Sequence, residues 1–117
     1  MRFLLTVVVA VFVAEAATAQ EPISAYRSAA MKKDYGAQRN VAYCLRTAEC
    51  PGSSTPKPIE ACAWQLVILA SGHPEVDSSD VANRRRDCGS LEPDEAYAAR
   101  RQADELFRKT YGRPLPS

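Results

Sequence analysis

A nearly uninterrupted apolar stretch at residues 59–70 dominates the hydropathy pattern of this chain. Only Glu60 and Gln65 are polar within it, so no wide polar face remains at the helical period of 3.6 residues. A helix of this length rises about 18 Å, which is too short to cross a hydrocarbon layer of about 30 Å. The pattern therefore predicts a buried central helix, with Pro58 in its first turn and Gly72 just past its end.

Two helices and a loop are predicted before the central helix. Residues 23–33 place apolar side chains at helical spacing, and a turn at residues 34–36 should end this segment because glycine costs about 1 kcal/mol inside a helix. Residues 50–57 contain two prolines and a glycine, which predicts an irregular loop. Between the turn and the loop, an apolar stripe at steps of three and four is formed by Ala37, Val41, Cys44, Leu45 and Ala48.

Two further helices are predicted after the central one. Asp77 or Ser78 should cap the fourth helix, and we expect its inward side chains to be Val81, Ala82 and Cys88. Pro93 should begin the fifth helix, and residues 112–117 should trail as an irregular tail. The buried side of the fifth helix is expected to consist of Ala96, Ala99, Ala103, Leu106, Phe107 and Thr110.

The fold class predicted from these segments is all-α. No run of β-branched residues with a period of two occurs outside the first 19 residues. We expect about five helices in antiparallel pairs, arranged as a short α-solenoid or as a compact bundle. The expected core consists of Ile59, Trp64, Leu66, Val67, Ile68, Val41, Leu45, Leu106 and Phe107.

Residues 1–19 have the composition of a secretory signal peptide. A positive charge precedes an apolar run at residues 3–13, and Ala-Thr-Ala at residues 17–19 offers the small-x-small pattern for cleavage. The run is too short for a membrane span. We therefore expect the mature chain to begin at Gln20, to form a single helical domain over residues 20–117 without a stable membrane anchor, and to be periplasmic or secreted.

Four cysteines behind a secretory leader indicate two disulfides. Cys62 and Cys88 lie at similar distances on either side of the turn near Pro74, so antiparallel helices should bring them level. Cys44 and Cys50 should then close the end of the second helix onto its loop. We predict the pairs Cys62–Cys88 and Cys44–Cys50, although Cys44–Cys62 with Cys50–Cys88 is also sterically reasonable. A zinc site is disfavoured because the chain has one histidine and no CxxC pair.

The sequence offers little for catalysis or for cofactors. Nucleophilic catalysis needs a nucleophile, a base and a group that orients the base, and the only histidine is His73. The nearby acidic residues Glu75, Asp77 and Asp80 are explained by helix capping rather than by metal ligation. The formal net charge of +1 argues against non-specific binding to nucleic acid. We assign no catalytic, metal or cofactor-binding residue and expect a protein that is not an enzyme.

The spacing of Ala61, Trp64 and Gly72, preceded by Val41 and Leu45, resembles the Sel1-like repeat, a relative of the tetratricopeptide repeat. The resemblance covers residues 37–72 and, more loosely, a second helix pair at residues 77–110. The chain departs from the repeat in its longer loop at residues 50–57 and in Gln65, where an aromatic residue is usual. The resemblance implies antiparallel helix pairs whose concave surface holds another protein.

We therefore expect an extracytoplasmic, non-catalytic adaptor or scaffold that binds another protein. Tyrosine and arginine are the residue types that most often carry interface energy, so the candidate contact residues are Tyr26, Tyr35, Arg39 and Tyr43. The alternative hypothesis is a small secreted effector or enzyme inhibitor that acts through the exposed loop at residues 50–57.

Overall fold

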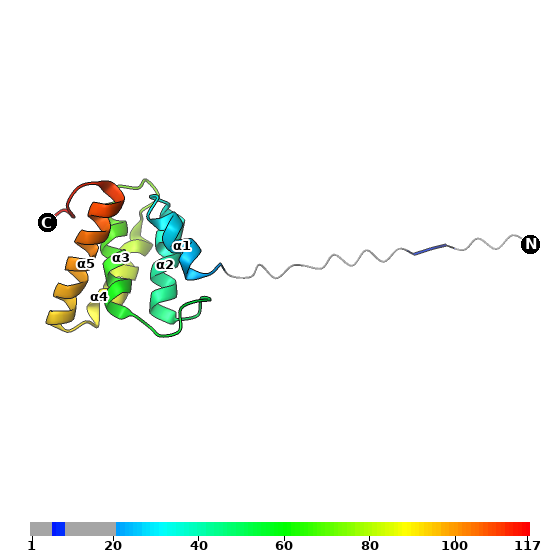
Figure 1. The fold of residues 1–117 in the computed structure, drawn as a ribbon, viewed down its shortest axis with the longest axis horizontal. Helices are drawn as coiled ribbons and strands as arrows, with labels where there is room; N and C mark the ends of the chain where they lie inside the picture. Colours follow the sequence, from blue (N-terminus) through cyan, green and yellow to red (C-terminus); the bar gives the residue numbers. More distant parts are fainter. Residues whose placement is uncertain (1–5, 9–20) are drawn as a thin grey trace, which may run out of the picture.

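The computed structural model describes residues 6–8 and 21–117, and its described part consists of five α-helices joined by short connections (Figure 1). The predicted cleavage site before Gln20 lies outside the described residues. None of the described helices combines the length and the apolar character that a membrane crossing requires. In chain order the helices are α1 (Ile23–Ala30), α2 (Tyr35–Thr47), α3 (Pro58–Ala70), α4 (Ser78–Gly89) and α5 (Pro93–Tyr111).

Helix α3 occupies the centre of the fold, as the sequence predicts. It packs against α2, α4 and α5, while α1 packs against α2. Figure 1 shows α3 between α2 and α5. Pro58 is its first residue, where a missing N–H costs nothing, and Gly72 adopts φ 71° just beyond its end. The prediction of an all-α fold built from sequential helix pairs is confirmed.

The core is built from large side chains of α2, α3 and α5. Trp64, Ile68, Val41, Leu45, Val67 and Phe107 are at most 1% exposed. Ile59, Leu66 and Leu106 lie at its margin and are only partly buried. Small residues, among them Ala42, Ala61, Ala63 and Ala103, fill the helix contacts. Their short side chains let neighbouring helix backbones approach one another closely.

The predicted turn between the first two helices lies too far along the chain. Helix α1 ends at Ala30, and the reversal falls on residues 31–33, where Lys33 has a positive φ of 70°. Asp34 caps α2 by accepting a hydrogen bond from the Ala37 N–H at 2.8 Å. Gly36 therefore lies inside the first turn of α2. A side-chain cap stabilises a helix start by about 1 kcal/mol, which offsets the helix penalty of that glycine.

The inward face predicted for α4 is correct at Cys88, which bonds to Cys62 of α3, and wrong at Val81 and Ala82. Val81 is 44% exposed, Ala82 is exposed, and the buried residues of this helix are Asp80 and Asp87. Helix α5 follows its predicted stripe except at Ala96, which is exposed. The error has one cause: α4 turns carboxylates rather than apolar side chains toward its neighbours, and an apolar stripe is what periodicity detects.

Residues 112–117 are irregular, as predicted, but they fold back against α5 instead of trailing away. The Leu115 N–H donates to Asp104 Oδ1 at 2.9 Å, and Arg100 Nη2 donates to the Pro116 carbonyl oxygen at 3.1 Å. The Arg113 guanidinium lies 4.7 Å from the centroid of the Phe107 ring. These contacts cover the C-terminal end of the core.

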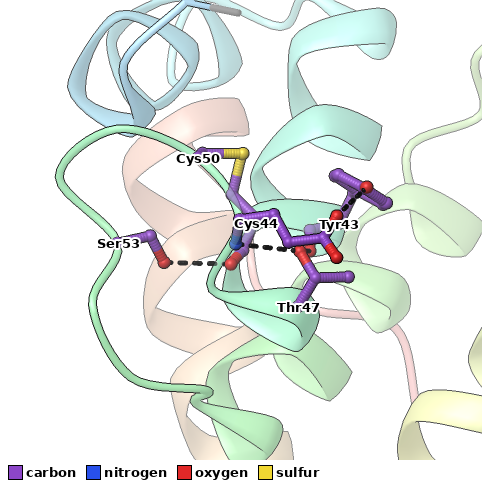
Figure 2. The surroundings of a disulfide bond; sticks show 6 residues. Tyr43, Cys44, Thr47, Cys50 and Ser53 are labelled. Atoms are coloured by element: carbon purple, nitrogen blue, oxygen red, sulfur yellow. Dashed lines mark hydrogen bonds between the residues drawn. A yellow bond between two sulfur atoms is a disulfide. The ribbon is translucent and has the colours of Figure 1, made fainter.

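Both predicted disulfides are present, Cys44–Cys50 and Cys62–Cys88. The first one closes a short loop onto the end of α2 (Figure 2). In the same picture Ser53 Oγ donates to the Cys44 carbonyl oxygen at 2.9 Å. The second bridge joins α3 to α4. Paired disulfides of this kind indicate that the chain folds in an oxidising, extracytoplasmic environment.

We expect the two disulfides to differ in their contribution to stability. They close loops with sequence separations of 26 and 6 residues, so loop-closure entropy assigns about 3.5 kcal/mol to Cys62–Cys88 and about 2 kcal/mol to Cys44–Cys50. Urea denaturation of Cys62→Ala/Cys88→Ala and of Cys44→Ala/Cys50→Ala measures both losses. Equal losses in the two double variants would contradict the loop-closure explanation.

Trp64 should be the most costly single side chain to truncate. It is 1% exposed and sits at the centre of α3, so Trp64→Ala is expected to lower the free energy of unfolding by about 3–5 kcal/mol. Val81→Ala on the exposed side of α4 is the control and should change it by less than about 0.5 kcal/mol. A loss below about 1.5 kcal/mol for Trp64→Ala would mean that the core does not depend on this side chain.

Candidate functional site

A cleft of about 520 Å³ lies between α2 and α4, with α3 beneath it. We call it the α2–α4 cleft. Its volume falls in the range of small ligand sites, but its walls are polar rather than apolar. It is lined by Tyr35, Gly36, Arg39, Asn40, Tyr43, Arg46, Gln65, Glu75, Asn83 and Arg86.

Two cross-helix ion pairs line up along this cleft. Arg39 Nε lies 3.4 Å from Asp80 Oδ1, and Arg46 Nε lies 3.2 Å from Asp87 Oδ1. The arginines are seven residues apart on α2 and the aspartates seven apart on α4. Helices α2 and α4 therefore run parallel to each other. The second ion pair follows the first after about two helical turns, or about 10.5 Å along the helix axis.

Asp80 is fully buried and belongs to three interactions at once. Its Oδ2 accepts hydrogen bonds from the Tyr35 hydroxyl at 2.5 Å and from the Asp77 N–H at 3.1 Å, while Oδ1 faces Arg39. The Asp77 contact completes a capping box at the start of α4. Asp80 is thus both a helix cap, as the sequence indicates, and the anchor that fixes α2 against α4.

Burial, assisted by the hydrogen bond to Asp80, raises the pKa of Tyr35 to about 12. The phenol therefore stays protonated and acts as a donor throughout the physiological range. The His73 ring stacks on the Tyr35 ring at 4.9 Å, and its Nδ1 accepts a hydrogen bond from the Glu75 N–H at 3.2 Å. Tyr35 lines the cleft, and His73 stacks on it from outside the lining.

Asp87 forms the second anchor, 1% exposed in its side chain. Its Oδ1 is shared by the Nε atoms of Arg46 and Arg86, at 3.2 and 3.3 Å. Its Oδ2 accepts a hydrogen bond from Gln65 Nε2 at 2.9 Å. The Gln65 Oε1 atom is buried and has no hydrogen-bond partner among the described residues. The polar position within α3 therefore forms the floor of the cleft.

Tyrosine rings support two of the arginines. The Arg39 guanidinium lies 5.6 Å from the Tyr35 ring centroid, and that of Arg46 lies 5.5 Å from the Tyr43 ring centroid. The Tyr43 hydroxyl donates to Glu49, a contact that raises the pKa of Tyr43. Cation–π contacts of this kind restrict the guanidinium orientations, so the cleft presents arginines that are held in place.

Three of the four predicted contact residues line the cleft: Tyr35, Arg39 and Tyr43. The fourth, Tyr26, belongs to α1 and packs against the core instead. Tyr35 is only 7% exposed, so a ligand meets little of its surface. Sequence reasoning missed the other half of the site, Arg46, Gln65, Asp80, Arg86 and Asp87. The equal spacing of Arg39 and Arg46 and of Asp80 and Asp87 is the signal that would have found it.

The arginine run at residues 84–86 divides between two surfaces. Arg86 turns toward the cleft, where its Nη2 also donates to Asn83 Oδ1 at 3.2 Å. Arg84 and Arg85 are exposed beside Val81, outside the cleft. This division agrees with the helical geometry, since three consecutive residues cannot face one site.

Two of the acidic residues near His73, Asp77 and Asp80, act as caps of α4. Asp77 Oδ1 accepts a hydrogen bond from the Ser79 N–H at 2.9 Å, and hydrogen bonds with Ser79 hold the pKa of Asp77 below its usual value. Within residues 6–8 and 21–117, no group of three or more histidine, cysteine or acidic side chains is placed to hold a metal ion.

Comparisons with protein-family models, with curated proteins and with solved structures found no match to this chain.

The Tyr35 hydroxyl should contribute measurably to stability. Tyr35→Phe removes a donor to the buried Asp80 and is expected to cost about 1–3 kcal/mol at neutral pH. Because the folded pKa of Tyr35 lies above the ordinary value of 10.0, this contribution is complete below that pH and is lost as the pH rises through about 12. Urea denaturation at pH 7 measures the cost.

Alkaline absorbance titration supplies a second measurement of the same contact. The wild-type chain should show one tyrosine that ionises about two pH units later than the exposed ones, and Tyr35→Phe should remove it. Tyr97→Phe, at a residue that is 66% exposed, is the control and should leave the late step in place. A late step that survives in Tyr35→Phe would show that another tyrosine causes it.

Proposed function

We propose that this chain is an exported, non-catalytic module that binds another protein in the α2–α4 cleft. The observation that carries the proposal is the set of three arginines on the cleft walls, Arg39, Arg46 and Arg86. Their side chains are 41%, 32% and 51% exposed, yet each forms an ion pair with a buried carboxylate. Side chains that are ordered before binding lose less conformational entropy when a partner arrives.

The helix arrangement supports a repeat-type binding module. Helices α2 and α4 line the cleft, while α3 packs against both of them and against α5. The pattern Pro-x-Glu-Ala-x-Ala begins both α3, at residues 58–63, and α5, at residues 93–98. The interval of 35 residues between positions 58 and 93 is close to the 34 residues of a tetratricopeptide repeat. These features favour the Sel1-like architecture implied by the sequence.

The chemistry of the cleft favours binding over catalysis. The Tyr35 hydroxyl is held as a donor to Asp80, and burial raises its pKa to about 12. A phenol in this state is a poor nucleophile at neutral pH. The His73 Nδ1 is occupied by a backbone N–H. The predicted leader and the two disulfides support a periplasmic or secreted location for this binding activity.

A second candidate is the inhibitor hypothesis, in which the loop at residues 50–57 enters a partner's cleft. The loop is fixed at both ends, by Cys44–Cys50 and by the Lys57 N–H, which donates to the Leu45 carbonyl oxygen at 2.7 Å. Residues 54–57 are exposed. A rigid, exposed loop is well suited to insertion, so the test must separate loop from cleft.

Site-specific photo-crosslinking in cells that export the chain provides this test. Benzoylphenylalanine replaces Asn40 in the cleft, Thr55 in the loop or Gln102 on the outer face of α5, all exposed positions. We expect a discrete cross-linked protein from position 40 only. Arg86→Glu should abolish this product, because it reverses one positive charge of the cleft. Asp87 would still be paired with Arg46 in this variant. The matched control is Arg84→Glu, on the same helix but outside the cleft, and should leave it unchanged.

Other outcomes of this experiment would contradict the proposal. A product from position 55 alone would favour the inhibitor hypothesis. Cross-linking from position 40 that is unaffected by Arg86→Glu would show that the arginines do not take part in binding. Turnover of any substrate by the purified chain would exclude a purely binding function.

A further inference from the structure

We propose that the α2–α4 cleft binds an extended acidic segment of the partner, in which two carboxylates lie three residues apart. This inference rests on the proposed function and names the chemistry of the bound segment. It follows from the charges that the cleft presents, from its unused hydrogen-bonding atoms and from the spacing of its arginines.

The surface that a ligand meets is cationic because burial separates the charges. The side chains of Asp80 and Asp87 are 0% and 1% exposed, whereas those of the three arginines are between 32% and 51% exposed. Asp87 is moreover shared by Arg46 and Arg86. Glu75 is the one acidic residue of the lining, and its N–H donates to His73, which lies outside the lining. A bound carboxylate therefore meets guanidinium groups first.

The arginines keep donors for such a ligand. All three face their aspartate through Nε. Within the described residues, the terminal nitrogens of Arg39 and Arg46 make no hydrogen bond, and Arg86 uses only Nη2, toward Asn83. An arginine has five N–H donors, and a pair of them matches the two oxygens of a carboxylate. Each of these arginines is thus oriented by the contact of its Nε with an aspartate, while it keeps other N–H donors for a ligand.

The floor of the cleft offers an acceptor of the right kind for a peptide backbone. Gln65 is 4% exposed, its Nε2 is fixed on Asp87, and its Oε1 has no partner among the described residues. A buried acceptor without a partner carries a desolvation cost of about 1–3 kcal/mol. A backbone N–H of a bound segment would remove that cost. Asn40 and Asn83 on the two walls can pair with further backbone groups.

The spacing of the arginines selects the conformation of the segment. Arg39 and Arg46 are seven residues apart on one helix, or about 10.5 Å along its axis. In a polyproline II segment, residues three apart point the same way and are about 9.3 Å apart. In a β-strand, side chains on one face are about 6.8 or 13.6 Å apart. The polyproline II spacing fits best, and Tyr43, which is 37% exposed and lines the cleft, provides a surface for the residues between the two carboxylates.

Fluorescence polarisation with the disulfide-bonded mature chain tests this inference. The probe is a labelled peptide with the core Glu-Pro-Pro-Glu, compared with Gln-Pro-Pro-Gln and with Glu-Pro-Glu-Pro, which shifts the second carboxylate by one residue. We expect the first peptide to bind at least about tenfold more tightly than either of the others, since one lost charge-assisted contact corresponds to about that factor. Its affinity should fall as salt rises.

Variants of the chain identify the residues responsible. Arg46→Gln and Arg86→Gln should each weaken the binding of the acidic peptide by about tenfold, because each removes one guanidinium group that can bind a carboxylate. Asp87 keeps one arginine partner in either variant, so its charge stays paired. Arg84→Gln/Arg85→Gln is the matched control and should have no effect. Inorganic phosphate at equal charge should fail to displace the peptide, because a single anion cannot occupy both arginine positions. Displacement by phosphate would reduce the site to a simple anion site and overturn the inference.

The remaining outcomes separate this inference from the proposed function. Equal binding of the neutral peptide would refute the acidic chemistry, and equal binding of the shifted peptide would refute the spacing. Tighter binding of a helical peptide with glutamates seven apart would refute the extended conformation. If all peptides fail while cross-linking from position 40 persists, the cleft binds a protein of other chemistry. If that cross-link is absent as well, the proposed function itself fails.

Discussion

Helix α3 must be covered on nearly all sides, and this requirement organises the molecule. Its apolar residues are satisfied on two sides by α2 and α5, which offer Val41, Leu45 and Phe107. The third side is different. Helix α4 brings almost no apolar surface, and its buried residues are Asp80 and Asp87. The hydrophobic effect alone therefore does not hold α4 in place.

Specific bonds hold α4 where apolar burial is lacking. The Cys62–Cys88 bridge fixes it to α3, Gln65 reaches Asp87 from the same helix, and Arg39 and Arg46 reach both aspartates from α2. Arg39, Arg46 and Gln65 consequently have two roles, because they hold α4 in place and also line the cleft. A change that loosened α4 would alter the shape of the cleft and the positions of its arginines together, so the stability of α4 and the shape of the cleft depend on the same few residues.

The parts of the fold that follow from apolar periodicity were predictable. Helix α3 with Pro58 and Gly72, the stripe of α2 and most of α5 bury what the sequence indicates, and the disulfide pairs follow from two antiparallel helices. The start of α2 was misplaced because a cap at Asp34 outweighs a glycine two residues later. The inward face of α4 was misplaced because buried carboxylates leave no apolar stripe. Half of the cleft stayed hidden for this reason, since Asp80 and Asp87 are recognisable as buried only once Arg39 and Arg46 are placed opposite them.

The two buried aspartates carry a free-energy cost of desolvation. Removing a carboxylate from water is unfavourable, and its pairing with arginine recovers that cost only when geometry and further hydrogen bonds are good. Asp80 and Asp87 each have such bonds, from Tyr35 and the Asp77 N–H and from Gln65. Apolar residues of similar size could fill the same space at no loss of stability in many proteins. What apolar residues could not do is form ion pairs with three guanidinium groups at the surface. We propose that the cost of burying these charges is explained by the cleft whose arginines they orient, and not by the core that they border.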